Sequence, residues 1–199
     1  MTATNGDRTT EKLDARRSAL IARDALDPRF RYQASLAAAR HGEEAIPVSP
    51  GTMVAGYWPI RSEIDPLPLL SAFRAKGARL CLPVVLDRET IAFREYLPDA
   101  QLVQTGFGTM GPDEHAPLAD PAVMLMPLAG FDRRGHRLGY GAGHYDRALA
   151  RFAARGLRPL LIGMAFDCQE LDHVPDEPHD IALDRILTET GLRTVATGL

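Results

Sequence analysis

The sequence lacks several features that would assign it to a class of protein at once. Its 199 residues include two cysteines, Cys81 and Cys168, which are far apart and form no CxxC pair, so neither a disulfide framework nor a zinc site is expected. No run of 18 apolar residues occurs, and the N-terminus has no apolar signal-peptide region. We therefore expect a soluble, cytoplasmic protein without a membrane segment. Internal repeats and low-complexity tracts are also missing.

An excess of positive charge is missing too. The chain carries 23 lysines and arginines against 26 aspartates and glutamates, a net charge of −3. It therefore has no global positive field of the kind that nucleic-acid binders use, and no nucleic-acid partner is expected. The length and the hydrophobic content of 45% suit one domain with a sizeable core. We expect a monomer in which this domain spans residues 10–199 and follows a disordered segment, residues 1–9.

The pattern of apolar residues predicts alternating strands and helices. Residues 97–121 are rich in glycine and proline and are predicted to form a long loop at the rim of the site. The alternation implies parallel strand pairs with right-handed crossovers, except that the link after Val85 is too short for a crossover, so residues 91–96 should pair antiparallel. Helices are expected over residues 10–25, from Asp27-Pro28 to about His41 with Gly42 as its stop, between Asp65-Pro66 and Gly77, and from about Tyr145 to Gly156, and strands over residues 53–58, 79–85, 91–96, 123–128, 158–166, 186–188 and 192–195.

The stretch from Gly130 to Arg147 carries most of the chemical information. It follows the apolar run 123–128 and precedes an amphipathic helical pattern, so the order is strand, glycine-rich loop, helix. Glycines at Gly139, Gly141 and Gly143 permit positive φ and close backbone approach, so that several N–H groups can point at one anion beside a helix N-terminus. Phosphate is the natural ligand of such a loop.

Charged residues in the same loop favour an anion site. Arg133, Arg134 and Arg137 can neutralise oxyanions, and Asp146 in the first helical turn could hold Mg²⁺ beside a polyphosphate. The glycine spacing, however, matches neither the dinucleotide fingerprint nor a Walker A loop. For the glycines alone, a surface turn between a strand and a helix remains open as an alternative.

The residues of this loop resemble a known family signature. Gly130-Phe-Asp-Arg-Arg-Gly-His-Arg-Leu-Gly-Tyr-Gly-Ala-Gly-His-Tyr-Asp146 is similar to the signature of the 5-formyltetrahydrofolate cyclo-ligase family, also called methenyltetrahydrofolate synthetases. The resemblance spans about Lys12 to Glu189. It continues upstream in Gly56-Tyr57-Trp58-Pro59 and Glu63-Ile64-Asp65, and downstream in Ile162-Gly163-Met164-Ala165-Phe166, Gln169 and His179-Asp180.

The resemblance implies a fold and an activity. The fold would be a three-layer α/β/α domain with a mostly parallel sheet, shared with the sugar-phosphate isomerase and CoA-transferase-like group. The activity would be the ATP- and Mg²⁺-dependent cyclisation of 5-formyltetrahydrofolate to 5,10-methenyltetrahydrofolate, with release of ADP and phosphate. ATP would be a co-substrate, Mg²⁺ the cofactor and a reduced folate the other substrate.

The resemblance also implies roles for individual residues. Lys12 and Arg16 project from one face of the first helix, where a solvated basic stripe is the alternative, and Lys12 and Arg137 would act on the transferring phosphate. Glu63 follows a predicted strand and would accept hydrogen bonds from the pterin, although an exposed loop carboxylate is often merely solvated. The ATP site would comprise Lys12, Arg16, Arg137, Leu138, Gly139, Tyr140, Gly141, Ala142, Gly143, His144 and Tyr145; the folate site Glu63, Tyr57, Trp58 and Tyr145; and the metal site Asp146 and Asp180.

Three departures from the family pattern leave alternatives open. Gly111-Pro112 stands where many members carry Glu-Pro, Ala142 where some have lysine, and His144 where tyrosine is usual. His179, before Asp180, could be a base or could simply orient the aspartate. The alternatives to the cyclo-ligase are a non-catalytic relative that binds nucleotide, RNA or folate, and a different ATP-dependent enzyme such as a small-molecule kinase on the same scaffold.

Overall fold

The computed structural model describes residues 5–106, 108–177 and 180–195, with side chains from Thr10 onward. Helices and strands alternate along most of this length, as the apolar pattern predicts. The elements are α1 (Asn5–Asp24), α2 (Pro28–Ala45), β1 (Met53–Ala55), α3 (Leu67–Ala75), β2 (Arg79–Val85), β3 (Ile91–Glu95), β4 (Leu102–Gly106), β5 (Thr109–Pro112), β6 (Val123–Pro127), β7 (Gly130–Phe131), β8 (Arg137–Leu138), α4 (His144–Ala154), β9 (Leu160–Met164), the 3₁₀ turn η1 (Asp167–Gln169), β10 (Arg185–Thr188) and β11 (Gly191–Thr194).

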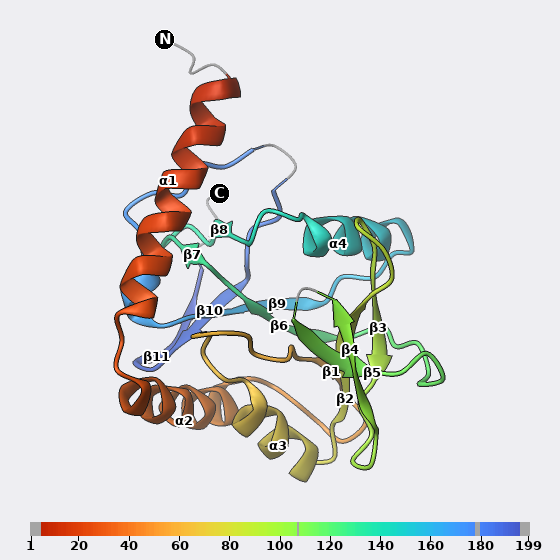
Figure 1. Cartoon of the computed structure of the whole chain (residues 1–199). Helices are drawn as coiled ribbons and strands as arrows, with labels where there is room; N and C mark the ends of the chain where they lie inside the picture. The colour runs from red at the N-terminus through yellow and green to blue at the C-terminus, as the bar shows by residue number, and fades with distance from the viewer. Residues whose placement is uncertain (1–4, 107, 178–179, 196–199) are drawn as a thin grey trace.

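A seven-stranded sheet forms the middle of the molecule, in the order β11-β10-β9-β6-β1-β2-β3 (Figure 1). The five inner strands are parallel, while β3 and β11 run antiparallel to their neighbours at the two edges. The inner strands read as near-continuous apolar runs because helices cover both faces of the sheet. The predicted α/β fold with a mostly parallel sheet is confirmed, whereas the likeness to the sugar-phosphate isomerase group stays a prediction.

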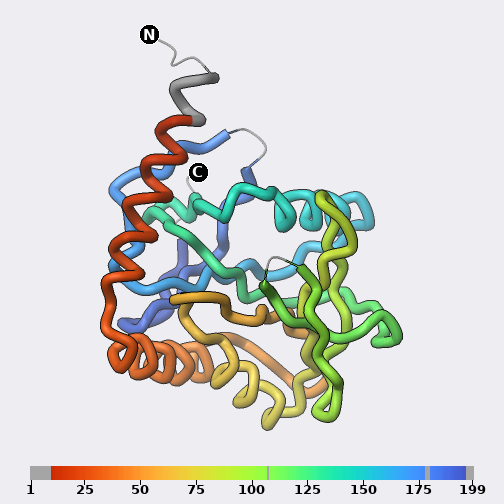
Figure 2. Tube along the Cα trace, viewed as in Figure 1, coloured from red at the N-terminus to blue at the C-terminus, as the bar shows by residue number. Residues whose placement is uncertain are grey.

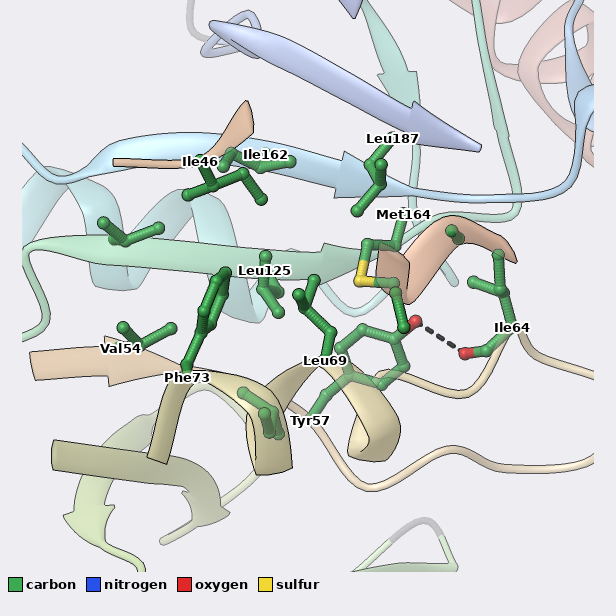
Figure 3. Close-up of a cluster of buried hydrophobic side chains, with 14 of the residues drawn as sticks. Ile46, Val54, Tyr57, Ile64, Leu69, Phe73, Leu125, Ile162, Met164 and Leu187 are labelled. Atoms are coloured by element: carbon green, nitrogen blue, oxygen red, sulfur yellow. Dashed lines mark hydrogen bonds between the residues drawn. The ribbon is translucent and has the colours of Figure 1, made fainter. Parts of the chain in front are cut away.

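Two hydrophobic cores separate the three layers. Helices α2 and α3 cover one face of the sheet, and α4 covers the other (Figure 1). In the first core, Leu69 and Phe73 of α3 pack against Val54 of β1 and Leu125 of β6 (Figure 3). Alternate residues of one strand serve opposite cores, since Leu125 joins the first core and Met124 the second. Burial on both faces thus fixes the register of the central strands.

Helix α1 lies along one side of these layers rather than within them (Figure 2). Its buried Ala19 faces the hairpin of β7 and β8, because a Cβ placed on Gly130 would come within 3.2 Å of the Ala19 methyl group. Small residues at this contact let the helix approach the backbone closely. One face of α1 is therefore held over the loop that follows β6. None of the described helices is both long and apolar enough to span a bilayer.

The structure corrects several predicted boundaries. Helix α1 starts at Asn5 rather than Thr10, so part of the segment expected to be unstructured is helical. Helix α2 is capped by Asp27 as predicted, but it continues through Gly42 to Ala45. A Cβ on Gly42 would lie 2.7 Å from the Cδ2 atom of Leu69, so this glycine allows close helix packing instead of ending the helix. The predicted long loop 97–121 was wrong in part, because it contains the antiparallel hairpin of β4 and β5.

Candidate active site

The candidate site lies where the order of strands reverses. After β1 the chain moves to β2 on one side, and β6 then pairs with β1 on the other side and leads on to β9. Loops that follow neighbouring parallel strands diverge at such a switch point, and ligands of open α/β sheets bind there, outside the carboxyl ends of the strands. The two loops are residues 56–66, with Glu63, and residues 128–143, with the glycine-rich sequence.

Two of the three glycines in the glycine-rich loop have the positive φ that the sequence suggested. Gly141 and Gly143 have φ of 95° and 65°, whereas Gly139 is not in the left-handed region. Gly143 is the N-cap of α4, so the loop leads directly into a helix N-terminus. Arg16 of α1 crosses to this loop, where its Nε donates to the carbonyl of Gly139 at 2.7 Å. A cation and a helix N-terminus therefore meet at one loop, as an anion site requires.

Cations and carboxylates of the predicted phosphate and metal sites are paired with each other. Lys12 Nζ lies 2.8 Å from Asp180 Oδ2 and 3.4 Å from Glu177 Oε2. The guanidinium of Arg137 donates to Asp146 and to the carbonyl of Ile181, the residue after Asp180. The structure thus links α1, β8 and α4 with Glu177, Asp180 and Ile181 in one cluster of opposite charges.

This cluster supplies two carboxylates for a metal ion. Within residues 5–106, 108–177 and 180–195, no group of three or more His, Cys, Asp and Glu side chains is arranged to hold a metal by itself. Mg²⁺ needs no such group, because it is usually bound through one or two carboxylates together with substrate phosphates and water. Asp146 and Asp180 therefore fit a Mg²⁺ ion that arrives with a nucleotide.

Glu63 is half-buried on the other side of the switch point. Its Oε2 accepts from the N–H of Ile60 at 2.9 Å, and its carboxyl group also bonds to the hydroxyl of Tyr140 in the glycine-rich loop. Burial raises the pKa of Glu63, while these two hydrogen bonds and the charges of Arg23 and Arg61 oppose the rise. The structure thus joins the loop predicted to bind folate to the loop predicted to bind ATP.

Sequence reasoning missed Arg23, which lies between these two loops. Arg23 is 1% exposed; its Nε donates to Ser62 Oγ at 2.9 Å and its Nη1 to the hydroxyl of Tyr140 at 2.6 Å. The spacing Lys12, Arg16, Arg23 is i, i+4, i+11, which places all three cations on one helix face. That spacing was the available signal, but it does not say which loops the three side chains reach.

Several predicted site residues lie in the core instead. Tyr57 is 3% exposed and donates from its hydroxyl to the carbonyl of Ile64 at 2.8 Å, so its ring is not a surface for a pterin (Figure 3). The neighbouring Trp58 is half-buried against the same core. The side chain of Leu138 is 1% exposed within a small core of its own, so this residue can offer the site its backbone only.

Two loop arginines also have other partners. Arg133 Nε donates to Glu170 at 2.7 Å, and Arg134 binds Asp132 with both Nε and Nη2. Asp132 is completely buried and also accepts from backbone N–H groups, so this pair holds the loop together rather than facing a ligand. Of the three loop arginines, Arg137 is the one that the structure places beside Asp146.

The departures from the family pattern lie in different surroundings. Gly111 in β5 packs on β2, where a Cβ would come within 2.9 Å of Val84 and 3.1 Å of the carbonyl of Pro83, so a glutamate would not fit without movement. His144 bonds through Nε2 with the carbonyl of Arg88. The carbonyl of Ala142 accepts from Arg147. His179 lies outside the described residues.

Comparison with known proteins identifies the family of this chain. A model of the 5-formyltetrahydrofolate cyclo-ligase family matches residues 8–189. Proteins named 5-formyltetrahydrofolate cyclo-ligase are 30% identical over 162 residues in Haemophilus influenzae, covering 78% of this chain and 86% of the relative, and 31% identical over 172 residues in Escherichia coli K12, covering 83% and 93%. The structure of a 5,10-methenyltetrahydrofolate synthetase from Aquifex aeolicus covers 94% of both chains with a TM-score of 0.76 and 28% identity. The chain therefore belongs to the 5-formyltetrahydrofolate cyclo-ligase family.

Proposed function

We propose that this protein cyclises 5-formyltetrahydrofolate to 5,10-methenyltetrahydrofolate with ATP and Mg²⁺, releasing ADP and phosphate. Family membership supports the reaction type. The structural observation that carries the proposal is the meeting of two loops at the switch point, one with the half-buried carboxylate of Glu63 and the other with the glycine-rich turn and its cations. Such a pair of loops can hold a neutral ring system and a polyphosphate side by side.

The nucleotide lies, in this proposal, against α1 and the glycine-rich loop. Lys12, Arg16 and Arg137 neutralise its phosphate oxygens, and backbone N–H groups from Gly139 to the start of α4 donate to them. Lys12 and Arg137 give up their present carboxylate partners to do so. These ion pairs hold both cations beside the glycine-rich loop.

Asp146 and Asp180 would hold the Mg²⁺ ion. The ion would supply charge neutralisation at the phosphate oxygens, as metal ions do in phosphoryl transfer generally. Asp146 sits in the first turn of α4, where the helix dipole favours a negative side chain. Lys12 and Arg137, the present partners of these two aspartates, would then be available to the phosphates.

The folate lies on the Glu63 side. An ionised glutamate can accept from the amino group and a ring N–H of the pterin, and the half-buried Trp58 offers the remaining aromatic surface there. The formyl oxygen on nitrogen 5 then attacks the γ-phosphorus of ATP and displaces ADP. Nitrogen 10 closes on the activated carbon and loses its proton to water, and phosphate leaves from the same carbon. No protein nucleophile is required, because positioning and charge stabilisation carry phosphoryl transfer.

The near-ultraviolet absorbance of the purified protein with 5-formyltetrahydrofolate and Mg²⁺, with and without ATP, tests the proposal. We expect a methenyl band that grows only with ATP and in step with ADP release. ATP binding without such a band would mean that the nucleotide site serves another substrate. Folate binding without any need for ATP would indicate a storage role.

A further inference from the structure

We propose that Arg23 is a positioning residue for Glu63: through the hydroxyl of Tyr140, it keeps the folate-binding carboxylate oriented and ready to accept hydrogen bonds. This inference rests on the proposed function, and it concerns a residue that no feature of the glycine-rich motif includes.

The surroundings of Arg23 compensate its buried positive charge only weakly. Arg23 is 1% exposed, and among the described residues its direct hydrogen-bond partners are two neutral hydroxyls, those of Ser62 and Tyr140. The nearest carboxylate in an ion pair is that of Asp24, which is 3.6 Å from Nε and largely exposed. A buried charge is costly unless it is well paired, and an apolar side chain of similar size would often be no less stable. The position therefore points to a functional use of the charge.

The hydroxyl of Tyr140 gives Arg23 a connection to Glu63. A phenol hydroxyl has one proton, so when it accepts from Arg23 Nη1 its own proton is free to point to Glu63. The guanidinium carbon also lies 5.9 Å from the centre of the Tyr140 ring. Two contacts with Arg23 thus hold the tyrosine, although 39% of its surface is exposed.

Ser62 fixes the other end of the connection. Its hydroxyl accepts from Arg23 Nε and donates to Asp24, so the residue before Glu63 is tied to the end of α1 at two points. Ser62 is itself buried. Arg23 therefore contacts both loops of the site, and moving it would shift Glu63 and Tyr140 relative to each other.

The charge of Arg23 also acts on the ionisation of Glu63. The titratable and charged groups that face this carboxyl are Tyr57, Arg23, Arg61, Tyr140 and Tyr145. Burial raises the pKa of each of the three tyrosines, so they are neutral near neutral pH. The two arginines are then the opposing charges, and Arg61 is exposed to solvent, which screens it. The buried Arg23 is the less screened of the two.

Loss of this charge should change folate binding in a pH-dependent way. Burial already raises the pKa of Glu63, and without Arg23 the rise is opposed less. The carboxylate then becomes protonated at a higher pH, and a protonated carboxyl group can no longer accept from both folate donors. As pH falls, the variant should lose folate affinity before the wild-type protein does.

The test is equilibrium dialysis of 5-formyltetrahydrofolate between about pH 5 and pH 8, without ATP, on the wild-type protein and three variants. Arg23→Met removes the buried charge, Tyr140→Phe removes only the hydroxyl, and Arg17→Met is the matched control on the exposed side of α1. At neutral pH we expect the first two variants to bind folate about tenfold more weakly or worse, with the loss growing as pH falls. The affinity of Arg23→Met for a non-hydrolysable ATP analogue should stay within about twofold of wild type.

Three results would overturn the inference. The folate affinity of both variants could depend on pH as that of Arg17→Met does, or it could be reduced by the same factor at every pH. The third result is a parallel loss of nucleotide affinity, which would mean general damage to α1. If Arg23→Met does not fold, Tyr140→Phe alone tests the inference, since Arg23 keeps its bond to Ser62 in Tyr140→Phe. Failure of the proposed function is separate: the wild-type protein would bind folate but form no methenyl product with ATP.

Discussion

Asp132 is the residue whose removal should tell most about what holds the glycine-rich loop in place. Its Oδ1 accepts from the N–H groups of Arg134 at 2.9 Å and His136 at 3.1 Å. Its Oδ2 accepts from the N–H of Val174 at 3.0 Å and from the Arg134 guanidinium at 2.8 Å. The carboxylate is 0% exposed. It therefore ties the β7–β8 hairpin to the segment after η1.

The substitution Asp132→Asn keeps the shape and removes one acceptor. The single amide oxygen can serve the Oδ1 side or the Oδ2 side but not both, and the amide NH₂ group then faces N–H donors. A buried donor left without an acceptor costs about 1–3 kcal/mol. Arg134 is half exposed, so water replaces part of its loss. We expect the free energy of unfolding to fall by about 2–4 kcal/mol at neutral pH.

The difference in the free energy of unfolding between the wild-type protein and Asp132→Asn should depend on pH. Burial alone would raise the pKa of Asp132, but the hydrogen bonds from Val174, Arg134 and His136 outweigh it and hold the pKa below the ordinary value of 3.8. A folded-state pKa below the unfolded value stabilises the protein above the unfolded pKa, and this contribution is lost as pH falls through the folded pKa. Asparagine does not ionise, so the stability gap should narrow below about pH 4.

Urea denaturation from neutral pH down to about pH 3.5 measures this gap. Asp172→Asn is the matched control, because Asp172 is exposed in the segment that Asp132 anchors. Ordinary surface substitutions change the free energy of unfolding by up to about 0.5 kcal/mol. The reasoning would be refuted if Asp132→Asn lowered it by less than this amount at neutral pH. A gap that stays constant as the pH falls would refute it too.

Three shorter predictions concern other parts of the chain. Asp146→Asn should lower turnover roughly a hundredfold or more, because it removes the proposed metal ligand beside the phosphates; near-normal turnover at saturating Mg²⁺ would contradict that role. Gly135→Ala and Gly156→Ala both place a side chain at positive φ, but a Cβ at Gly135 meets a backbone oxygen at 2.8 Å while Gly156 has nothing within 4 Å. Gly135→Ala should therefore be less stable by a further 1–3 kcal/mol or so in thermal or urea unfolding, and equal losses would refute the steric argument. A thiol reagent should modify the exposed Cys168 in the native protein and reach Cys81, whose pKa burial raises, only after unfolding; equal native rates would contradict the assigned burial.

The parts of the fold that sequence predicts well are those fixed by local pattern. The strand Arg79–Val85 has the predicted bounds. Its apolar run lies between Gly77, which ends the preceding helix, and a polar segment, so the sequence allows only one placement of the strand. The glycine-rich turn from Gly139 to Gly143 leads into a helix as predicted, although the hairpin of β7 and β8 separates it from β6. Residues at fixed spacing, such as Lys12 and Arg16, could be placed on one helix face for the same reason.

The parts that sequence misses depend on contacts between distant segments. Strand β4 has partly exposed residues on both faces and no apolar alternation, so nothing local distinguishes it from a loop. Gly42 reads as a helix stop unless Leu69 is known to press against it. The ring of Tyr57 could have faced the site or the core, and burial decides that only once the sheet and α3 are assembled. The role proposed for Arg23 likewise depends on its contacts with Ser62 and Tyr140, which are distant in the sequence.

The position of α1 has a consequence for how the protein is made. The helix is synthesised first, yet Lys12 pairs with Asp180 and Arg16 with Gly139, which are separated from them by 168 and 123 residues. At about 5–20 residues per second, a ribosome takes roughly 10–30 s to synthesise the residues that separate these partners. Until then Lys12 and Arg16 lack these two partners, although Arg23 of the same helix can already reach Ser62. The contact between Lys12 and Asp180 is thus among the last that a nascent chain can form, and a pause in translation before residue 180 delays it.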